Sequence, residues 1–399
     1  MRFAASTVSL TASFAIVAPS LAIDEAHQKK AEVVIAKAMT YLLAQQDKAS
    51  GGFAVPPKES QQPQYPAITG LILNGMLMQP KLTAEQQAAA DRGVAYMLSL
   101  RQPDGGIYDG MLPSYNTSIC LSALARVNTP EAKEAIKAGQ EFLKKSQWGA
   151  SETAASKAEP LFPVPENHPF YGGVGYGKHG RPDMSNTQFM LQALQDTGVP
   201  KDDPAVKRAI KFMARCQMNG KTNDQPYAAG SQQGGFIYAT GENGQTAGLG
   251  QSFAGAFEET LDNGEKASRL RAYGSMTYAG FKSYLYAGLS PTDPRVTTAM
   301  EWISKNYSVD ENPGVGQDGR YYFYVTFSRA LDATGKATLK TIDSSGKETD
   351  RDWQNDLIDA MEKLQNADGS FKSVNERWME NNPILITAYS LVALQHAAR

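Results

Sequence analysis

Two kinds of apolar pattern alternate along the chain, and the first is typical of helices on a protein surface. Residues 206–217 have one apolar face and one charged face at helical spacing. The apolar face holds Val206, Ala209, Ile210 and Met213. Residues 352–364 repeat the arrangement, with Trp353, Leu357 and Met361 on the apolar side. These segments predict outer, half-exposed helices.

The second pattern is apolar almost all round, which requires a helix buried on every side. Residues 384–394, ILITAYSLVAL, are of this kind. Three such segments share a spacing in which Thr is followed at helical intervals by two Leu residues: Thr117, Leu121 and Leu124; Thr187, Leu191 and Leu194; Thr387, Leu391 and Leu394. These segments predict inner helices.

Paired in order, the segments predict six units of one outer and one inner helix. We expect outer helices near residues 31–46, 83–101, 130–147, 203–217, 293–307 and 350–365, and inner helices near 65–78, 114–127, 184–197, 273–288, 320–333 and 383–396. The predicted fold is an all-α, six-unit α/α toroid, a double ring of outer amphipathic and inner buried helices. A linear solenoid is the alternative. Residues 235–238, GFIY, are the only strand candidate.

In a toroid of this kind, every connection from an outer to an inner helix emerges at one end, beside the N-termini of the inner helices. The two longest connections, at about residues 149–182 and 218–271, are both of this type and rich in glycine. Loops this long are usually functional or disordered. We therefore expect them to wall one mouth of the toroid and to carry any ligand or partner site.

The N-terminus predicts export. Arg2 precedes an apolar stretch at residues 3–21, and Ser20-Leu21-Ala22 fits the small-residue rule for signal-peptide cleavage. Cleavage near Ala22 would leave residues 23–399 as a single toroid domain, periplasmic or secreted. An uncleaved anchor is the alternative. No later segment approaches the roughly 20 apolar residues of a membrane-spanning helix.

Charge, cysteine and histidine content narrow the function further. The chain has 39 Lys+Arg against 41 Asp+Glu and no basic block, which argues against a nucleic-acid partner. Cys120 and Cys216 lie far apart in apolar helical patterns, which indicates buried free thiols. No ligand spacing for a metal occurs among His27, His168, His179 and His396. We therefore expect no metal site and no cofactor.

The outer helices end in a recurrent signature, in which a basic and a small residue are followed by an aromatic residue, an apolar residue and Gln. Copies are Lys37-Ala38…Tyr41-Leu42…Gln46, Lys137-Ala138…Phe142-Leu143…Gln147 and Arg208-Ala209…Phe212-Met213…Gln217, and Arg92-Gly93…Tyr96-Met97…Gln102 has one extra residue. Turns such as Gly51-Gly52-Phe53, Asp104-Gly105-Gly106 and Asp368-Gly369 follow the glutamines. The signature resembles the repeat of squalene and other triterpene cyclases, shared more loosely by the β subunits of protein prenyltransferases. In that repeat the Gln ties one outer helix to the next.

The resemblance implies two chemistries, and the chain departs from both. Proton-initiated cyclases carry a D-x-D-D-T acid motif at the start of an inner helix, and residues 183–187, DMSNT, stand in a comparable setting. Asp183 and Thr187 match, but Ser185 stands where the family has its proton donor, and a serine cannot supply a strong acid. Prenyltransferases hold zinc with Asp, Cys and His, whereas residues 317–325 hold one Asp and neither Cys nor His.

Asp183 is the candidate catalytic residue, with a helix N-cap as the alternative role. Candidate cavity or ligand-binding residues are Tyr115, Ser185, Phe189, Tyr278, Tyr322, Phe327 and Tyr389. Aromatic faces at these positions would stabilise a cation, and packed core is the alternative.

Three functions remain open. The first is an exported cyclase-like protein that binds an isoprenoid or another apolar small molecule, with altered or absent cyclisation chemistry. The second is a non-catalytic scaffold that binds a protein or peptide partner at the mouth. The third is a carbohydrate-active toroid enzyme, which would need two carboxylates at the mouth. The available pairs are Asp183 with Glu258, Glu259 or Asp318.

Overall fold

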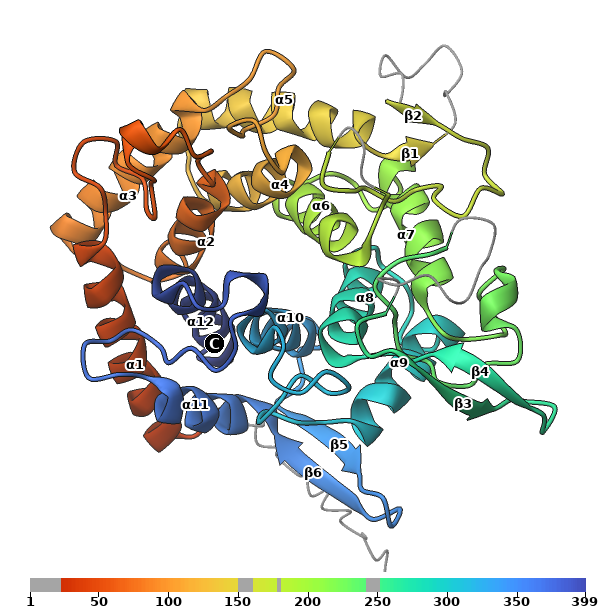
Figure 1. The fold of residues 1–399 in the computed structure, drawn as a ribbon. Coiled ribbons are helices and arrows are strands. Elements are labelled where there is room, and N and C mark those ends of the chain that lie inside the picture. Colours follow the sequence, from red (N-terminus) through yellow and green to blue (C-terminus); the bar gives the residue numbers. More distant parts are fainter. Residues whose placement is uncertain (1–22, 150–160, 178–180, 242–251) are drawn as a thin grey trace, which may run out of the picture.

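The computed structural model describes residues 23–149, 161–177, 181–241 and 252–399 of the 399-residue chain. The predicted signal peptide, residues 1–22, and His179 lie outside the described residues. The described ranges hold two concentric rings of helices (Figure 1). The outer ring consists of α1 (Glu25–Ala44), α3 (Ala84–Ser99), α5 (Pro130–Lys145), α7 (Pro204–Cys216), α9 (Pro294–Lys305) and α11 (Trp353–Leu364). The inner ring consists of α2 (Pro66–Met76), α4 (Pro113–Leu124), α6 (Met184–Asp196), α8 (Gly274–Tyr286), α10 (Arg320–Asp332) and α12 (Pro383–Ala397).

The inner helices close into a ring. Each packs against the inner helices before and after it, and α12 packs against α2 as well as α10 (Figure 1). In the outer ring, α11 likewise contacts α1. A solenoid would leave its first and last units apart, so the prediction of an all-α, six-unit toroid is confirmed.

Burial follows the two sequence patterns. Every residue of α2 is buried, and so is every residue of α12 from Leu385 to Ala397. In α7 the apolar face with Val206 and Met213 is buried, while Lys207 is exposed. The inner helices therefore supply most of the core, and the outer helices separate it from solvent.

The recurrent glutamines join neighbouring outer helices. Four of them donate from Nε2, each at 2.8 Å, to a backbone carbonyl of the next outer helix: Gln46 to Ala89, Gln147 to Ala205, Gln217 to Arg295 and Gln365 to Val34. The last contact joins α11 to α1 and closes the outer ring. Gln102, in the copy with one extra residue, instead bonds Leu100 and Tyr108 of its own loop.

The glycines that follow these glutamines lie against the next outer helix. Gly172 has φ +89°, and a Cβ placed on it would lie 1.8 Å from the carbonyl oxygen of Arg208 in α7. Equivalent approaches join Gly51 to Arg92, Gly105 to Ala138, Gly234 to Thr298 and Gly369 to Lys37. Only glycine allows both the positive φ and this close backbone contact.

The sequence prediction for strands was wrong. Residues 235–238 form no strand, and Phe236 makes only an isolated bridge to Gln217. Two antiparallel hairpins were missed: β3 (Ala256–Thr260) with β4 (Lys266–Leu270), and β5 (Thr338–Ile342) with β6 (Glu348–Asp352). A short parallel pair joins β1 (Trp148–Gly149) to β2 (Phe162–Pro163). Both hairpins are too polar and exposed to show an alternating apolar pattern. Since β6 takes residues 350–352, α11 begins at Trp353 rather than 350.

Other sequence expectations can be placed on this fold. Cys120 and Cys216 are buried and form no disulfide, as predicted. No helix within the described ranges is both long and apolar enough to cross a membrane.

Candidate functional site

A cavity opens at the mouth of the toroid, which we define as the end where the inner helices begin. It encloses about 230 Å³. Its aromatic lining residues are Tyr65, Tyr115, Tyr176, Tyr238, Phe253, Tyr273, Tyr322, Trp378 and Tyr389. Aliphatic and thioether side chains line much of the rest: Ala67, Ile68, Leu71, Leu112, Met276, Met379 and Leu385. The polar lining residues besides the phenols are Asn116, Ser185, Ser275 and Glu380.

Two of the long loops that wall the mouth are fastened by one buried arginine. Arg215, at the end of α7, is 2% exposed and donates to the backbone carbonyls of Glu166 and His168 at 2.9 and 2.7 Å. Its guanidinium also binds the carboxylate of Asp224 at 2.8 Å. Arg215 thus connects the loop before α6 to the loop before α8.

Four of the residues predicted to line a cavity do so. The hydroxyls of Tyr115 and Tyr389 lie 3.1 Å apart, and Tyr322 donates to Ser185 Oγ at 3.2 Å. These two hydrogen bonds satisfy phenols that α4, α10 and α12 bring to the cavity. Burial raises the pKa of all three phenols, so each stays neutral.

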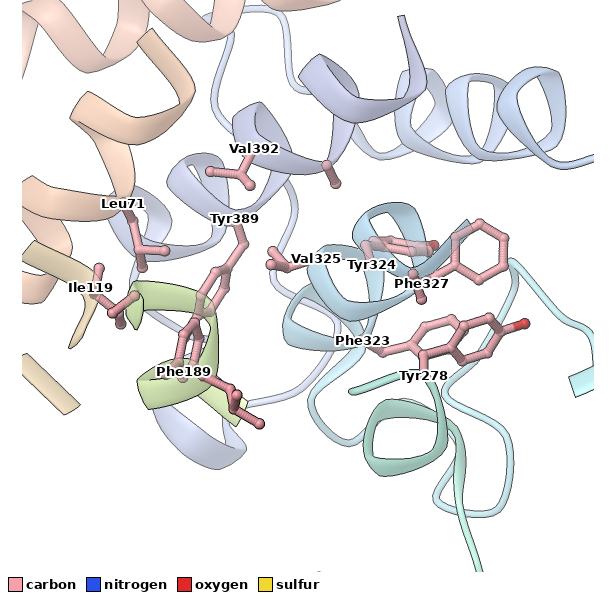
Figure 2. Close-up of a cluster of buried hydrophobic side chains, with 14 of the residues drawn as sticks. Leu71, Ile119, Phe189, Tyr278, Phe323, Tyr324, Val325, Phe327, Tyr389 and Val392 are labelled. Atoms are coloured by element: carbon pink, nitrogen blue, oxygen red, sulfur yellow. The ribbon is translucent and has the colours of Figure 1, made fainter. Parts of the chain in front are cut away.

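The other three predicted cavity residues lie in the core (Figure 2). Phe189 packs edge-on against Tyr115, with ring centroids 5.0 Å apart, and so supports the cavity wall from behind. The rings of Tyr278 and Phe327 pack together between α8 and α10, with their centroids 5.0 Å apart. For Phe189, Tyr278 and Phe327 the packed-core alternative describes what the structure shows.

Asp183 is the N-cap of α6. Its Oδ1 accepts from Asn186 N at 2.9 Å and its Oδ2 from Asn186 Nδ2 at 2.8 Å. The residue is 2% exposed and does not line the cavity. Burial, the largest influence, raises its pKa to about 7 against the hydrogen bonds from Asn186. The capping role is therefore directly visible, and a proton-donating role for Asp183 stays a prediction.

Sequence reasoning missed Glu380, which lines the cavity. It is 1% exposed, and its Oε1 accepts from the backbone nitrogens of Tyr321 and Tyr322 at 3.0 Å each. Its Oε2 is buried and has no hydrogen-bond partner among the described residues. Burial raises the pKa of this carboxyl to about 7. The available signal was an acid in the connection before α12, two residues after Trp378.

Sequence reasoning also missed the strained rim beside Glu380. Trp378 and Met379 both have positive φ, +55° and +66°, although neither is glycine. Both line the cavity and are partly exposed, as is Tyr176. Leu112, another lining residue, has φ +49°. No pattern of apolar positions reveals such backbone conformations, because they depend on tertiary contacts.

The acids proposed as partners of Asp183 are engaged elsewhere. Glu258 pairs with Lys266 across the β3–β4 hairpin, and Asp318 pairs with Arg377 at 2.6 Å. Glu259 lies in β3, rather than in a loop as expected, and accepts from Ser231, Gln232 and Gln233. Within the described part of the chain, no three His, Cys, Asp or Glu side chains gather as metal ligands would.

Comparison with known proteins gives one curated relative in sequence. The chain is 27% identical over 163 residues to lanosterol synthase erg7A of Aspergillus fumigatus. The aligned region covers 39% of this chain and 20% of the synthase. The chain thus matches about a fifth of that relative's length. No protein-family model matches the chain.

Solved structures share the fold. A variant of the type II terpene cyclase MstE from Scytonema, in complex with its product merosterolic acid A, has a TM-score of 0.51 at 13% identity and covers 94% of this chain and 99% of its own. A second variant of the same enzyme, in complex with its substrate geranylgeranyl dihydroxybenzoate, has a TM-score of 0.50 at 13% identity, with the same coverage of both chains. An α-1,6-mannanase from Salegentibacter, in complex with α-1,6-mannotriose, gives 0.57 at 8% identity and covers 92% and 99%. These likenesses show the fold alone.

Proposed function

We propose that this chain, whose recurrent signature and fold are those of the squalene and terpene cyclase-like superfamily, binds an isoprenoid or a similar apolar molecule in the cavity at its mouth. The observation that carries the proposal is the lining of that cavity. Most of its walls are aromatic or aliphatic, and the phenol hydroxyls of Tyr115, Tyr322 and Tyr389 are bonded within the protein. Such a surface favours apolar occupants.

The enclosed volume favours a short ligand. At about 230 Å³ the cavity is smaller than the roughly 300–1,000 Å³ typical of pockets that bury a drug-sized molecule. A chain of a few prenyl units, or the end of a longer chain that extends out between the mouth loops, fits this space better than a complete triterpene. The structural relative MstE takes a geranylgeranyl substrate in the same type of toroid.

The residues favour binding, or altered chemistry, over ordinary cyclisation. Ser185 occupies the place of the cyclase proton donor and is bonded to Tyr322. Carbohydrate cleavage is less well supported, because it requires two available carboxylates and the acids paired with Asp183 in that hypothesis already have partners. We further propose that the protein acts outside the cytoplasm, after removal of residues 1–22.

The proposal can be tested by identifying what the protein carries. The protein would be purified from its native host, and bound lipid would be extracted and identified by mass spectrometry. We expect an isoprenoid or similar apolar molecule. Ala67→Phe, which places a ring in the cavity from α2, should remove that molecule while the protein stays folded.

Ala88→Phe, at an exposed position on α3, is the matched control and should retain the molecule. The proposal would be abandoned if no apolar molecule co-purifies and geraniol, added to the purified protein, does not bind by calorimetry. Capture of a protein partner that Ala67→Phe does not disturb would favour the scaffold function instead.

A further inference from the structure

We propose that Glu380 is the polar anchor of the cavity and that the ligand carries a protonated amine, which donates a hydrogen bond to Glu380 Oε2 and lies against the surrounding aromatic faces. This inference rests on the proposed function, because it names the head group of the molecule that occupies the same cavity. Three features support it.

The first feature is the arrangement of the carboxylate. Oε1 is occupied by the backbone nitrogens of Tyr321 and Tyr322, so Oε2 is the oxygen left for a ligand. The other polar lining residues are already bonded: Asn116 to Ala67 and Met111, Ser275 to Asn312, and Ser185 to Tyr322. A buried carboxylate oxygen without a partner is costly. A donor in the cavity would remove that cost.

The second feature is the set of aromatic rings around the acid. A cation held over aromatic faces is stabilised by the ring quadrupoles, and cages of this kind recognise organic ammonium groups. The protein's own cation already uses two of these rings at the rim. The guanidinium of Arg377 lies 5.0 Å from the ring centre of Phe253 and 4.6 Å from that of Trp378.

Charge favours an amine over a neutral alcohol. An alcohol can bond Oε2, but it does not balance the negative charge that Glu380 carries when it is ionised, and burying such a charge without a partner is costly. A protonated amine supplies both the hydrogen bond and the opposite charge. No lysine or arginine side chain lines the cavity, so within the described residues this pairing comes from the ligand.

The third feature is the strained backbone that delivers Glu380. Trp378 and Met379 adopt the left-handed region, which costs a bulky residue free energy and persists only where the surroundings impose it. The strain lets Trp378 and Met379 stand at the rim while Glu380, the next residue, turns inwards to a 1% exposed position. Strain at a site of this kind is typical of ligand recognition.

The test uses two probes with the same isoprenoid chain, geranylamine and geraniol, titrated into the full mature protein by calorimetry at neutral pH. We expect geranylamine to bind wild type at least roughly tenfold more tightly than geraniol. Glu380→Gln should weaken geranylamine by about the same factor and leave geraniol nearly unchanged. The glutamine Oε1 can still accept from Tyr321 and Tyr322, so the variant should remain folded, which thermal unfolding would verify.

Glu376→Gln is the matched control. Glu376 lies four residues before Glu380, its side chain is exposed, and the substitution removes the same charge. It should leave both affinities at wild-type values. Equal affinity of geraniol and geranylamine in wild type, or an unchanged geranylamine affinity in Glu380→Gln, would overturn the inference while the cavity remains a ligand site. Failure of both probes to bind would instead count against the proposed function itself.

Discussion

Glu380 Oε1 lies 3.0 Å from the backbone nitrogen of Tyr321 and caps a helix that begins sixty residues earlier in the chain. Gly319, the residue at the N-cap position of α10, has no side chain to fill this role. The negative carboxylate also lies at the positive end of the helix dipole. One acid thus fastens the connection before α12 to the start of α10 and faces the cavity with its other oxygen.

Replacement of Glu380 should therefore destabilise the protein, and more strongly when the new side chain has no hydrogen-bond acceptor for the start of α10. Glu380→Ala removes the acceptor for two buried N–H groups and is expected to lower the free energy of unfolding by about 2–4 kcal/mol. Glu380→Gln keeps an acceptor and should lower it by less than about 1.5 kcal/mol. Denaturant unfolding at constant pH would measure both values, with the exposed Glu376→Ala as control. A cost of Glu380→Ala no larger than that of the control would contradict the capping role.

The toroid could be predicted because two apolar periodicities alternate along the sequence. Outer helices need one buried face and inner helices need all faces buried, and the six pairs follow in order. Four of the seven predicted cavity residues line the cavity for the same reason. Tyr115, Ser185, Tyr322 and Tyr389 lie near the beginnings of inner helices or on the side that faces the cavity.

The remaining parts of the site depend on tertiary contacts that no periodicity encodes. Phe189 and Phe327 are aromatic and lie on inner helices, as Tyr115 and Tyr322 do, but their positions on the helix direct them into the core. Glu380 and Trp378 belong to a loop whose left-handed backbone could not be anticipated from apolar spacing. Loops of this kind supply much of the cavity wall.

Asp183→Asn should change how stability depends on pH. Burial raises the folded-state pKa of Asp183 from 3.8 to about 7. Because its folded-state pKa is raised, the protonated carboxyl contributes to the free energy of unfolding, and this contribution is complete below pH 3.8. The contribution is lost as the pH rises to about 7. The unfolding free energy of the variant relative to wild type should therefore rise between these limits, by up to about 1.4 kcal/mol per pH unit.

Wild type and Asp183→Asn must be compared at each pH, because His396 also makes stability depend on pH. Burial lowers its pKa to about 4, so it acts in the opposite direction in both proteins and cancels in the difference. Denaturant titrations from pH 4 to pH 8 would give that difference. Asp202→Asn, at an exposed acid between α6 and α7, should follow the wild-type curve throughout. Parallel curves for wild type and Asp183→Asn would show that the Asp183 carboxyl has no raised pKa.

Gln217→Ala should weaken the outer ring more than the same change at Gln102. Gln217 is fully buried, donates to Gly234 and Arg295 and accepts from the hydroxyl of Tyr284. Its loss leaves buried polar groups without partners, which is expected to cost about 2–4 kcal/mol. Among the residues that the structure describes, the side chain of Gln102 bonds two carbonyls of its own loop, so Gln102→Ala should cost about 1 kcal/mol or less. Equal costs in denaturant unfolding would show that the contact between outer helices adds nothing.

Gly172→Ala should destabilise the toroid through a backbone contact rather than through φ alone. A Cβ at Gly172 would lie 1.8 Å from the carbonyl oxygen of Arg208, so α7 and the loop before α6 would have to move apart. Gly264→Ala is the matched control, because Gly264 has nearly the same φ, +85° against +89°, and no heavy atom within 4 Å of its Cβ position. Positive φ costs an alanine roughly 1 kcal/mol at both sites. We expect the cost of Gly172→Ala in denaturant unfolding to exceed that of the control by at least about 2 kcal/mol. If the two costs agree, the close approach of Gly172 to α7 is not what selects glycine there, and the equivalent glycines at the other outer helices would need a different explanation.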